Sequence, residues 1–321
     1  MGHKIKKKRK KKYTNAGLSS ISVSQPLIRI IAPKNISIFS NRENFIRFLN
    51  KIKSYDRSPN RIPIIFIDLN FVEICDEPSI TIMLSAINEL TRKSIKCTGN
   101  VPLNPYARDI LDKSGFFSHL KDIQKVYFSQ LSKCQNQILK IGESIIDSKI
   151  IGEIVKQCTF KLTGNYKHFN KLYTVLMEII PNTIEHAYKS KSSKSWFLGI
   201  KYDVVNNKVI FTFVDNGSGI LNTIYKLPKK RTEDLRLLKS EPLILEGVFD
   251  KKYNSRLKEE NRNKGLPIVK SIFEEGYIKK LKVFSNFAGI EFSGVNYFEL
   301  KNEFKGTIFY FEVDKECIEK L

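Results

Sequence analysis

The first third of the chain alternates between short apolar runs and stretches in which apolar residues recur every three or four positions. Unbroken runs rich in Ile and Phe are typical of buried strands, and the longer period is typical of helices that bury one face. Strands are therefore expected over 27–33, 62–70 and 94–102, and helices over 41–52, 79–93 and 105–116. This order predicts a small α/β sandwich, in which Ser79 caps the second helix and Gly115 ends the third.

The second half of the chain predicts strands that neighbour each other directly. Two runs, over 196–204 and 208–216, are joined by Asn206-Asn207, a pair typical of a β-hairpin turn. Outside this hairpin, the pattern predicts a helix over 166–187, a helix that begins at Gly265 and a strand over 306–313.

The helix over 166–187 carries a polar stripe on an otherwise apolar surface. Glu178, Asn182 and His186 are spaced four residues apart, so they lie on one slowly rotating face of the helix. Polar side chains among apolar residues have to form hydrogen bonds, either within the protein or to a ligand. The stripe alone leaves both options open, and Pro181 inside the helix costs ~3 kcal/mol unless a kink is tolerated.

Two glycine-containing segments stand where strands and helices meet. The second hairpin strand ends at Asp215, and Gly217 and Gly219 follow, which allows the loop to pass close to a flat ligand. Gly265 stands immediately before a helix, whose first backbone N–H groups favour a phosphate. Either segment alone is a weak signal, but the order and spacing of the stripe, the loop and the helix start are specific.

In this order and spacing, the motifs over about 160–315 resemble those of the GHKL ATPase fold, which gyrase, heat-shock chaperones, histidine kinases and mismatch-repair proteins share. The resemblance implies a Bergerat-type α/β sandwich with a mostly antiparallel sheet, and it implies ATP and Mg²⁺ as ligands. The implied ATP-binding residues are Asn182, His186, Asp215, Gly217, Gly219, Ile220, Lys264, Gly265, Leu266 and Thr307.

The resemblance also implies a role for each group. Asp215 accepts a hydrogen bond from the adenine amino group, and the glycines after it let the backbone approach the purine. Asn182 is the implied Mg²⁺ ligand, because its neutral oxygen suits a hard cation that bridges the phosphates. Glu178 is the implied catalytic residue, which orients or deprotonates a water or a hydroxyl. Lys264 and the amides after it would cradle the β- and γ-phosphates. Whether His186 touches the nucleotide or bonds only to the backbone stays open.

The first third of the chain, over about 27–120, resembles the STAS domain, a bacterial regulatory module of the anti-anti-sigma type. The resemblance rests on the stretches FIDLNFVEICDEPSITIMLSAINEL and NPYARDILDKSGFFSHL. In that family, a Ser or Thr that follows an Asp before the long helix can be phosphorylated. Here Glu77 and Pro78 separate Asp76 from Ser79, so Ser79 is expected to be a helix cap and not a phosphosite.

These patterns divide the chain into four parts: a disordered basic tail over 1–26, a STAS-like domain over 27–120, a connector over 121–165 and a GHKL domain over 166–321. The net charge of the 321 residues is +22, and eight of the nine residues from Lys4 to Lys12 are basic. Such charge attracts nucleic acid, anionic membranes or acidic partners. Lys far outnumbers Arg and aromatic residues are not interleaved with Arg, so we expect nonspecific nucleic-acid contact through the tail at most.

The remaining composition indicates a cytoplasmic protein. No apolar run approaches the ~18 residues that a membrane-spanning helix needs, and the basic start lacks the apolar segment of a signal peptide. The five cysteines are scattered without metal-ligand spacing, which disfavours a disulfide framework or a zinc site.

Three functions fit this organisation. The favoured one is an Mg-ATP-binding regulatory protein with slow ATP hydrolysis, in which a lid over 221–263 closes over the nucleotide and controls a protein partner. The first alternative is an anti-sigma-type serine/threonine kinase, in which Glu178 activates a hydroxyl of a partner. The second is a basic DNA-associated ATPase in phage defence or mobile-element control. The chain ends soon after Val313, so we expect no transducer domain, and a homodimer stays an open option.

Overall fold

The computed structural model describes residues 27–56, 63–117, 136–142, 148–186, 195–225, 240–250 and 265–320, and side chains in all of these except 136–142, 183–186 and 195. The predictions for the tail over 1–26, for Lys264 and for the side chain of His186 therefore lie outside the described residues. Most of the expected lid over 221–263 lies outside them as well.

The N-terminal unit, residues 27–117, contains a parallel sheet with helices against it. Its strands pair in the order β1-β3-β5 in one sheet and β2-β4 in a second, and both sheets are parallel. The elements are β1 (Leu27–Ile31), β2 (Asn35–Ile36), α1 (Arg42–Lys53), β3 (Ile64–Asp68), β4 (Ile74–Cys75), α2 (Glu77–Arg92), β5 (Lys96–Gly99) and α3 (Pro105–Lys113). The strands and helices predicted for this part of the chain are confirmed.

The expected cap of α2 is wrong, because Asp76 and not Ser79 is the N-cap. The carboxylate of Asp76 accepts a hydrogen bond from the backbone N–H of Ser79 at 2.8 Å. Pro78 lies in the first turn of α2, where a backbone N–H would have no intrahelical acceptor, so the missing N–H of proline costs nothing. Ser79 is fully buried, and its Oγ accepts a hydrogen bond from the amide of Ile38 at 2.8 Å.

The C-terminal unit, residues 136–320, is built on an antiparallel sheet of five strands in the order β6-β7-β8-β10-β9. These strands are β6 (Asn136–Gly142), β7 (Ser195–Asp203), β8 (Lys208–Asp215), β9 (Lys279–Glu291) and β10 (Asn296–Asp314). The predicted hairpin is confirmed: β7 pairs with β8 from Trp196 opposite Asp215 to Asp203 opposite Lys208. The predicted mostly antiparallel sheet is also confirmed.

Two strand predictions need correction. The strand expected to open at Gly306 begins ten residues earlier, at Asn296, so Gly306 lies inside β10. Its partner β9 was not predicted at all. The buried polar pair Ser285 and Asn286 interrupts the apolar pattern of β9, and Asn286 has a φ of +56° that a regular strand does not have.

Six helices complete the described part of the C-terminal unit. They are α5 (Ser148–Thr163), α6 (Asn170–His186), α7 (Ile220–Ile224), α9 (Glu241–Phe249), α10 (Gly265–Glu274) and α11 (Lys315–Glu319). The helix predicted over 166–187 begins four residues later than expected and continues through Pro181. The described residues of the expected connector over 121–165 form the edge strand β6 and the whole of helix α5.

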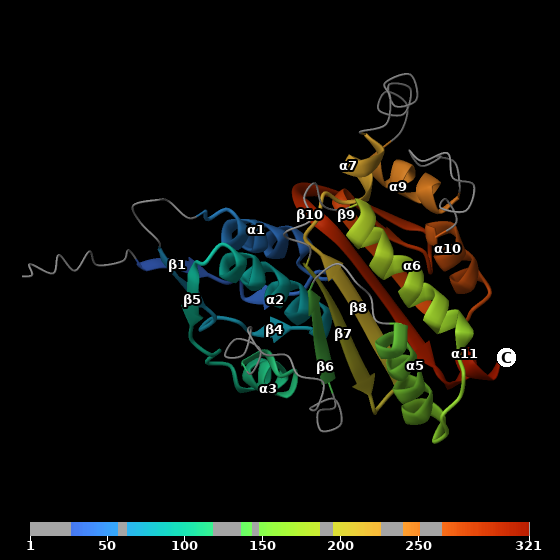
Figure 1. The fold of residues 1–321 in the computed structure, drawn as a ribbon. Coiled ribbons are helices and arrows are strands. Elements are labelled where there is room, and N and C mark those ends of the chain that lie inside the picture. Colours follow the sequence, from blue (N-terminus) through green and yellow to red (C-terminus); the bar gives the residue numbers. More distant parts are fainter. Residues whose placement is uncertain are drawn as a thin grey trace, which may run out of the picture.

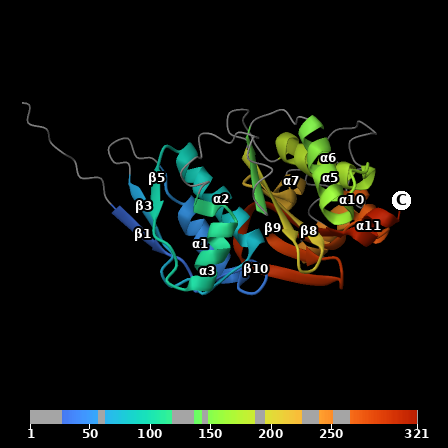
Figure 2. The ribbon, with the colours of Figure 1, turned by 90° about the horizontal axis from the view of Figure 1, so that it is seen from below.

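The elements stack in layers that alternate between sheets and helices. Helices α1 and α2 lie between the parallel sheet β1-β3-β5 and the five-stranded sheet, as Figures 1 and 2 show. One apolar core joins the N-terminal unit to side chains of the five-stranded sheet, including Phe197, Val214 and Ile308. A second core lies on the opposite face of that sheet, under α5, α6, α9 and α10. Within the described residues, no helix has the length and apolar character needed to cross a membrane.

Candidate functional site

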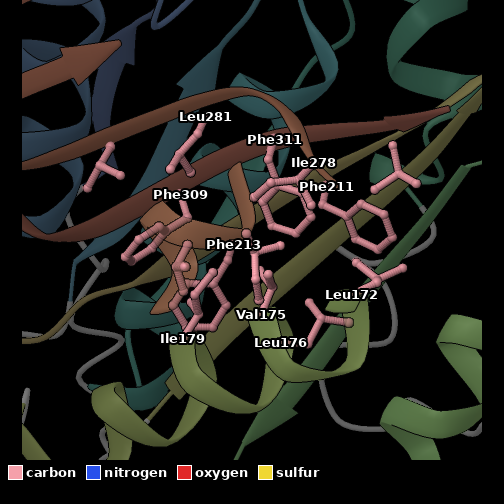
Figure 3. Packing of buried hydrophobic residues seen from close by; sticks show 14 of the residues in the cluster. Leu172, Val175, Leu176, Ile179, Phe211, Phe213, Ile278, Leu281, Phe309 and Phe311 are labelled. Carbon is pink, nitrogen blue, oxygen red and sulfur yellow. The ribbon is translucent and has the colours of Figure 1, made fainter. Parts of the chain in front are cut away.

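Helix α6 is seated on the five-stranded sheet by an apolar face. Side chains three and four positions apart point toward the sheet, as expected for a helix that packs on one side (Figure 3). Four side chains of α6 pack against four Phe side chains of β8 and β10 in this core: Leu172, Val175, Leu176, Ile179, Phe211, Phe213, Phe309 and Phe311. This packing fixes the rotation of α6 and therefore the direction of its polar stripe.

The polar stripe of α6 meets the first residue of α10. A Cβ atom built on Gly265 would lie 2.6 Å from Oε2 of Glu178 and 3.1 Å from Nδ2 of Asn182. Any larger residue at this position would displace one of the two side chains. The two segments singled out in the sequence, the stripe and the glycine before the helix, thus lie against each other. Leu266, the next residue of α10, packs half-buried on the same core as α6.

Glu178 lies in surroundings that suit proton transfer. Its side chain is half-buried, and this partial desolvation raises the pKa of its carboxyl group above the ordinary Glu value. A carboxylate with a raised pKa is a stronger base than an exposed Glu. Its carboxylate lies beside Gly265, the first residue of α10.

Asp215 stands at the end of β8, on the face of the sheet that α6 covers. It follows the core residue Phe213 by two positions, and its partner on β10, Thr307, precedes the core residue Phe309 by two. Asp215 and Thr307 are therefore cross-strand neighbours on one face, and both are buried. One carboxylate oxygen of Asp215 accepts a hydrogen bond from the backbone N–H of Gly217 at 2.7 Å, which shapes the loop after the strand.

The loop after Asp215 turns into α7 at Gly219. Gly219 has a φ of +81°, which residues with a Cβ rarely adopt, and a Cβ there would lie 2.3 Å from Oδ1 of Asn286. The backbone N–H of Ile220 donates to Oγ of Ser285 at 2.8 Å. We call residues 215–222 the glycine loop.

Three residues that sequence reasoning missed hold the glycine loop. Ser285 receives the amide of Ile220, and Asn286 donates to the carbonyl of Ser218 at 2.9 Å. Glu303 in turn accepts from Nδ2 of Asn286 at 3.2 Å. The available signal was the polar Ser285-Asn286 pair inside an apolar run, since a buried polar pair in a strand requires partners.

The glycine loop and the α6–α10 contact lie at the same end of the five-stranded sheet. β7 begins next to Asp215, and only residues 187–194 separate it from the end of α6. In both Figure 1 and Figure 2, α7, which follows the loop, lies beside α6. Of the predicted site residues, Glu178, Asn182, Gly265 and Leu266 thus form one group, and Asp215, Gly217, Gly219, Ile220 and Thr307 form the other.

Comparisons with protein-family models and with curated proteins found no match for this chain.

Proposed function

We propose that the C-terminal unit binds Mg-ATP and hydrolyses it slowly, and that nucleotide binding controls a protein partner. The observation that carries this proposal is the close approach of Gly265 to Glu178 and Asn182. It combines a helix N-terminus, which favours phosphate, with a half-buried carboxylate and a neutral amide. The resemblance to the GHKL ATPases supports the same conclusion, because the members of that fold use this set of groups for ATP.

The residues present fit a magnesium nucleotide. Mg²⁺ at such sites is bound by one or two protein oxygens together with phosphate oxygens and waters, so it needs no large cluster of acidic residues. Asn182 would hold Mg²⁺, which when bound neutralises part of the phosphate charge. Asp215, beside Thr307, would accept a hydrogen bond from the adenine amino group. The backbone from Gly217 to Gly219 would lie along the purine.

Glu178 would act on the γ-phosphate side of the nucleotide. Its raised pKa suits a group that takes a proton from a water or a hydroxyl. Hydrolysis is favoured over transfer to the chain's own N-terminal unit, because Ser79 is fully buried and its Oγ is engaged with the amide of Ile38. A kinase that acts on a separate protein would use the same Glu178.

Calorimetry with Mg-ATP tests nucleotide binding. Wild type should bind, and Asp215→Ala should lose detectable binding, because the adenine amino group would lose its hydrogen-bond acceptor. Asp109→Ala is the matched control, since it removes an exposed carboxylate from an ion pair with Lys113 in α3. Wild type without binding, or Asp215→Ala with wild-type affinity, would contradict the proposal.

Incubation with γ-labelled ATP tests the reaction. We expect slow release of free labelled phosphate from the wild type and release about 10²–10³-fold slower from Glu178→Ala. Label that appears on a partner protein would show a kinase instead, and the absence of both products would reduce the protein to a binding switch.

A further inference from the structure

Strand β10 is irregular over residues 300–306, which we call the β10 bulge. Its register with β9 shifts between Glu299 and Phe304, and again between Phe304 and Thr307. Such irregularities re-aim side chains and backbone near functional sites. The β10 bulge is bonded to α1 of the N-terminal unit and also to the glycine loop.

Glu43 in the first turn of α1 binds the start of the β10 bulge. Its Oε1 accepts the backbone N–H of Lys301 at 3.0 Å. Its Oε2 accepts the backbone N–H and the side-chain Nδ2 of Asn302, at 3.2 and 2.9 Å. One carboxylate thus satisfies two backbone donors that the irregular strand leaves without a ladder partner at these positions.

Two further side chains of α1 bind the other end of the β10 bulge. Nδ2 of Asn50 donates to the carbonyl of Glu303 at 2.7 Å. Nζ of Lys53 donates to the carbonyl of Lys305 at 3.4 Å and lies over the ring of Phe304, 4.7 Å from its centroid. Helix α1 therefore holds the backbone of the bulge on both sides of Glu303.

The side chain of Glu303 continues this chain of hydrogen bonds to the glycine loop. Its Oε1 accepts from Nδ2 of Asn222 at 3.1 Å and from Nδ2 of Asn286 at 3.2 Å. Asn286, which is 1% exposed, donates to the carbonyl of Ser218 and accepts the backbone N–H of Asn222. A part-buried network centred on the buried Asn286 has few alternative arrangements, so a shift at one end is transmitted to the other.

A second hydrogen-bonded link connects α2 to the same loop. Nδ2 of Asn216 donates to the backbone carbonyl of Ser85 at 3.0 Å. The close approach of Gly306 to the glycine loop adds packing, because a Cβ there would lie 2.0 Å from the carbonyl oxygen of Asp215. Both helices that lie between the sheets thus bear on the residues around Asp215.

We propose that Glu303 is a positioning residue for the nucleotide-binding loop, and that the N-terminal unit controls ATP affinity through α1, the β10 bulge and Glu303. This inference rests on the proposed binding of ATP at Asp215. Because α1 holds the bulge and the bulge holds the loop, any partner or ligand that moves α1 changes the affinity for ATP. By thermodynamic linkage, ATP must act on the α1 contacts to the same extent.

The affinity for ATP, measured by calorimetry on the full chain, tests the coupling. Glu303→Ala should weaken binding about tenfold, the size expected for losing hydrogen bonds to a charged acceptor. Glu303→Gln keeps an oxygen acceptor and should restore the affinity to within about threefold of wild type. Thermal melting of each variant checks that it is folded.

The decisive variant is Glu43→Ala, because the hydrogen bonds of Glu43 to the β10 bulge are its link to the glycine loop among the described residues. It should weaken ATP binding about threefold, and its effect should not add to that of Glu303→Ala, since both act on one path. Glu73→Ala is the matched control: it removes a carboxylate from the same unit, where it pairs with Lys34, and should leave the affinity unchanged.

Hydrogen exchange gives a readout that a merely structural role would not change. A non-hydrolysable ATP analogue at saturation should protect residues 42–53 of α1 in the wild type, and this protection should disappear in Glu303→Ala while that of the glycine loop remains. Wild-type ATP affinity in both Glu43→Ala and Glu303→Ala, with binding lost in Asp215→Ala, would overturn the coupling and leave the ATP proposal intact. A wild type that does not bind ATP would overturn both.

Discussion

Helices α2 and α6 cover opposite faces of the same five-stranded sheet, and both carry polar residues in a largely apolar sequence. On α2, Ser79 and Ser85 are fully buried and bond to backbone: Ser79 accepts from Ile38, and Ser85 donates to the carbonyl of Ile82 at 2.7 Å. On α6, Glu178 and Asn182 are only half-buried, and they face Gly265 at the start of another helix.

The difference lies in what surrounds each set of polar groups. α2 is enclosed between two sheets, so its hydroxyl groups have to be satisfied by the protein itself. α6 has one face on the sheet and turns its stripe toward a helix N-terminus with room made by a glycine. The polar residues of α6, unlike those of α2, are incompletely buried and face groups that can bind a ligand, which is why the proposed ligand is placed at α6.

The difference between the two helices is tested most directly by removing one polar group from each. Glu178→Ala should lower ATP turnover about 10²–10³-fold, because it removes a general base, and should change ATP affinity little. Ser85→Ala on α2 should leave both unchanged and cost only about 1 kcal/mol of stability for the lost hydrogen bond. Equal turnover in wild type and Glu178→Ala would remove Glu178 as the catalytic group.

A second variant tests the space at the start of α10. Gly265→Ala places a Cβ where it overlaps Glu178 and Asn182, so ATP affinity should fall about tenfold or more. Gly152→Ala in α5 is the matched control, because nothing lies within 4 Å of the added Cβ. It should leave ATP affinity unchanged and raise stability by about 0.5–1 kcal/mol. Titration calorimetry and urea unfolding measure the two effects, and wild-type affinity in Gly265→Ala would show that nucleotide does not need this contact.

The pH dependence of ATP turnover and of stability tests the role of Glu178. Partial burial raises the pKa of Glu178, so turnover should rise with pH through a value above that of an ordinary Glu. A raised carboxyl pKa means that the folded state holds the proton more tightly than the unfolded state. Stability from this group is therefore present at low pH and is lost as pH rises from the ordinary Glu value through the raised one.

Glu178→Gln separates this stability effect from catalysis. At neutral pH it should melt about 1–2 °C higher than wild type, because the cost of a half-buried charge is removed. At a pH below the ordinary Glu value, the two proteins should melt together. A melting temperature below that of wild type at neutral pH would mean that the charge of Glu178 is stabilised by partners.

An effect on stability alone is expected for Asn88 on α2. Its side chain is 1% exposed, and neither amide atom has a hydrogen-bond partner among the described residues. Asn88→Leu keeps a similar volume and should raise stability by about 1 kcal/mol in urea unfolding, with ATP turnover unchanged. A loss of stability would indicate a buried water that Asn88 binds.

Much of the local structure could be predicted because its signals are local. The apolar spacing of α1, α2 and α6 and the Asn206-Asn207 turn depend on neighbours within one or two turns of chain. The predictions failed where a distant partner decides. Ser79 has the sequence context of a helix cap, but its hydroxyl accepts a hydrogen bond from the distant Ile38. The sequence of β9 does not read as a strand, because its polar residues Ser285 and Asn286 form hydrogen bonds to the glycine loop.

The sequence by itself singled out the candidate site residues: Glu178 and Asn182 in one stripe, and Asp215 before its glycines. Only the tertiary structure decided that Gly265 meets that stripe, and that α1 reaches the loop through Glu303. The physical reason is range. Side-chain periodicity is set by the helix and the strand themselves, whereas a contact between residues 253 positions apart depends on how whole layers pack, and no local pattern encodes that.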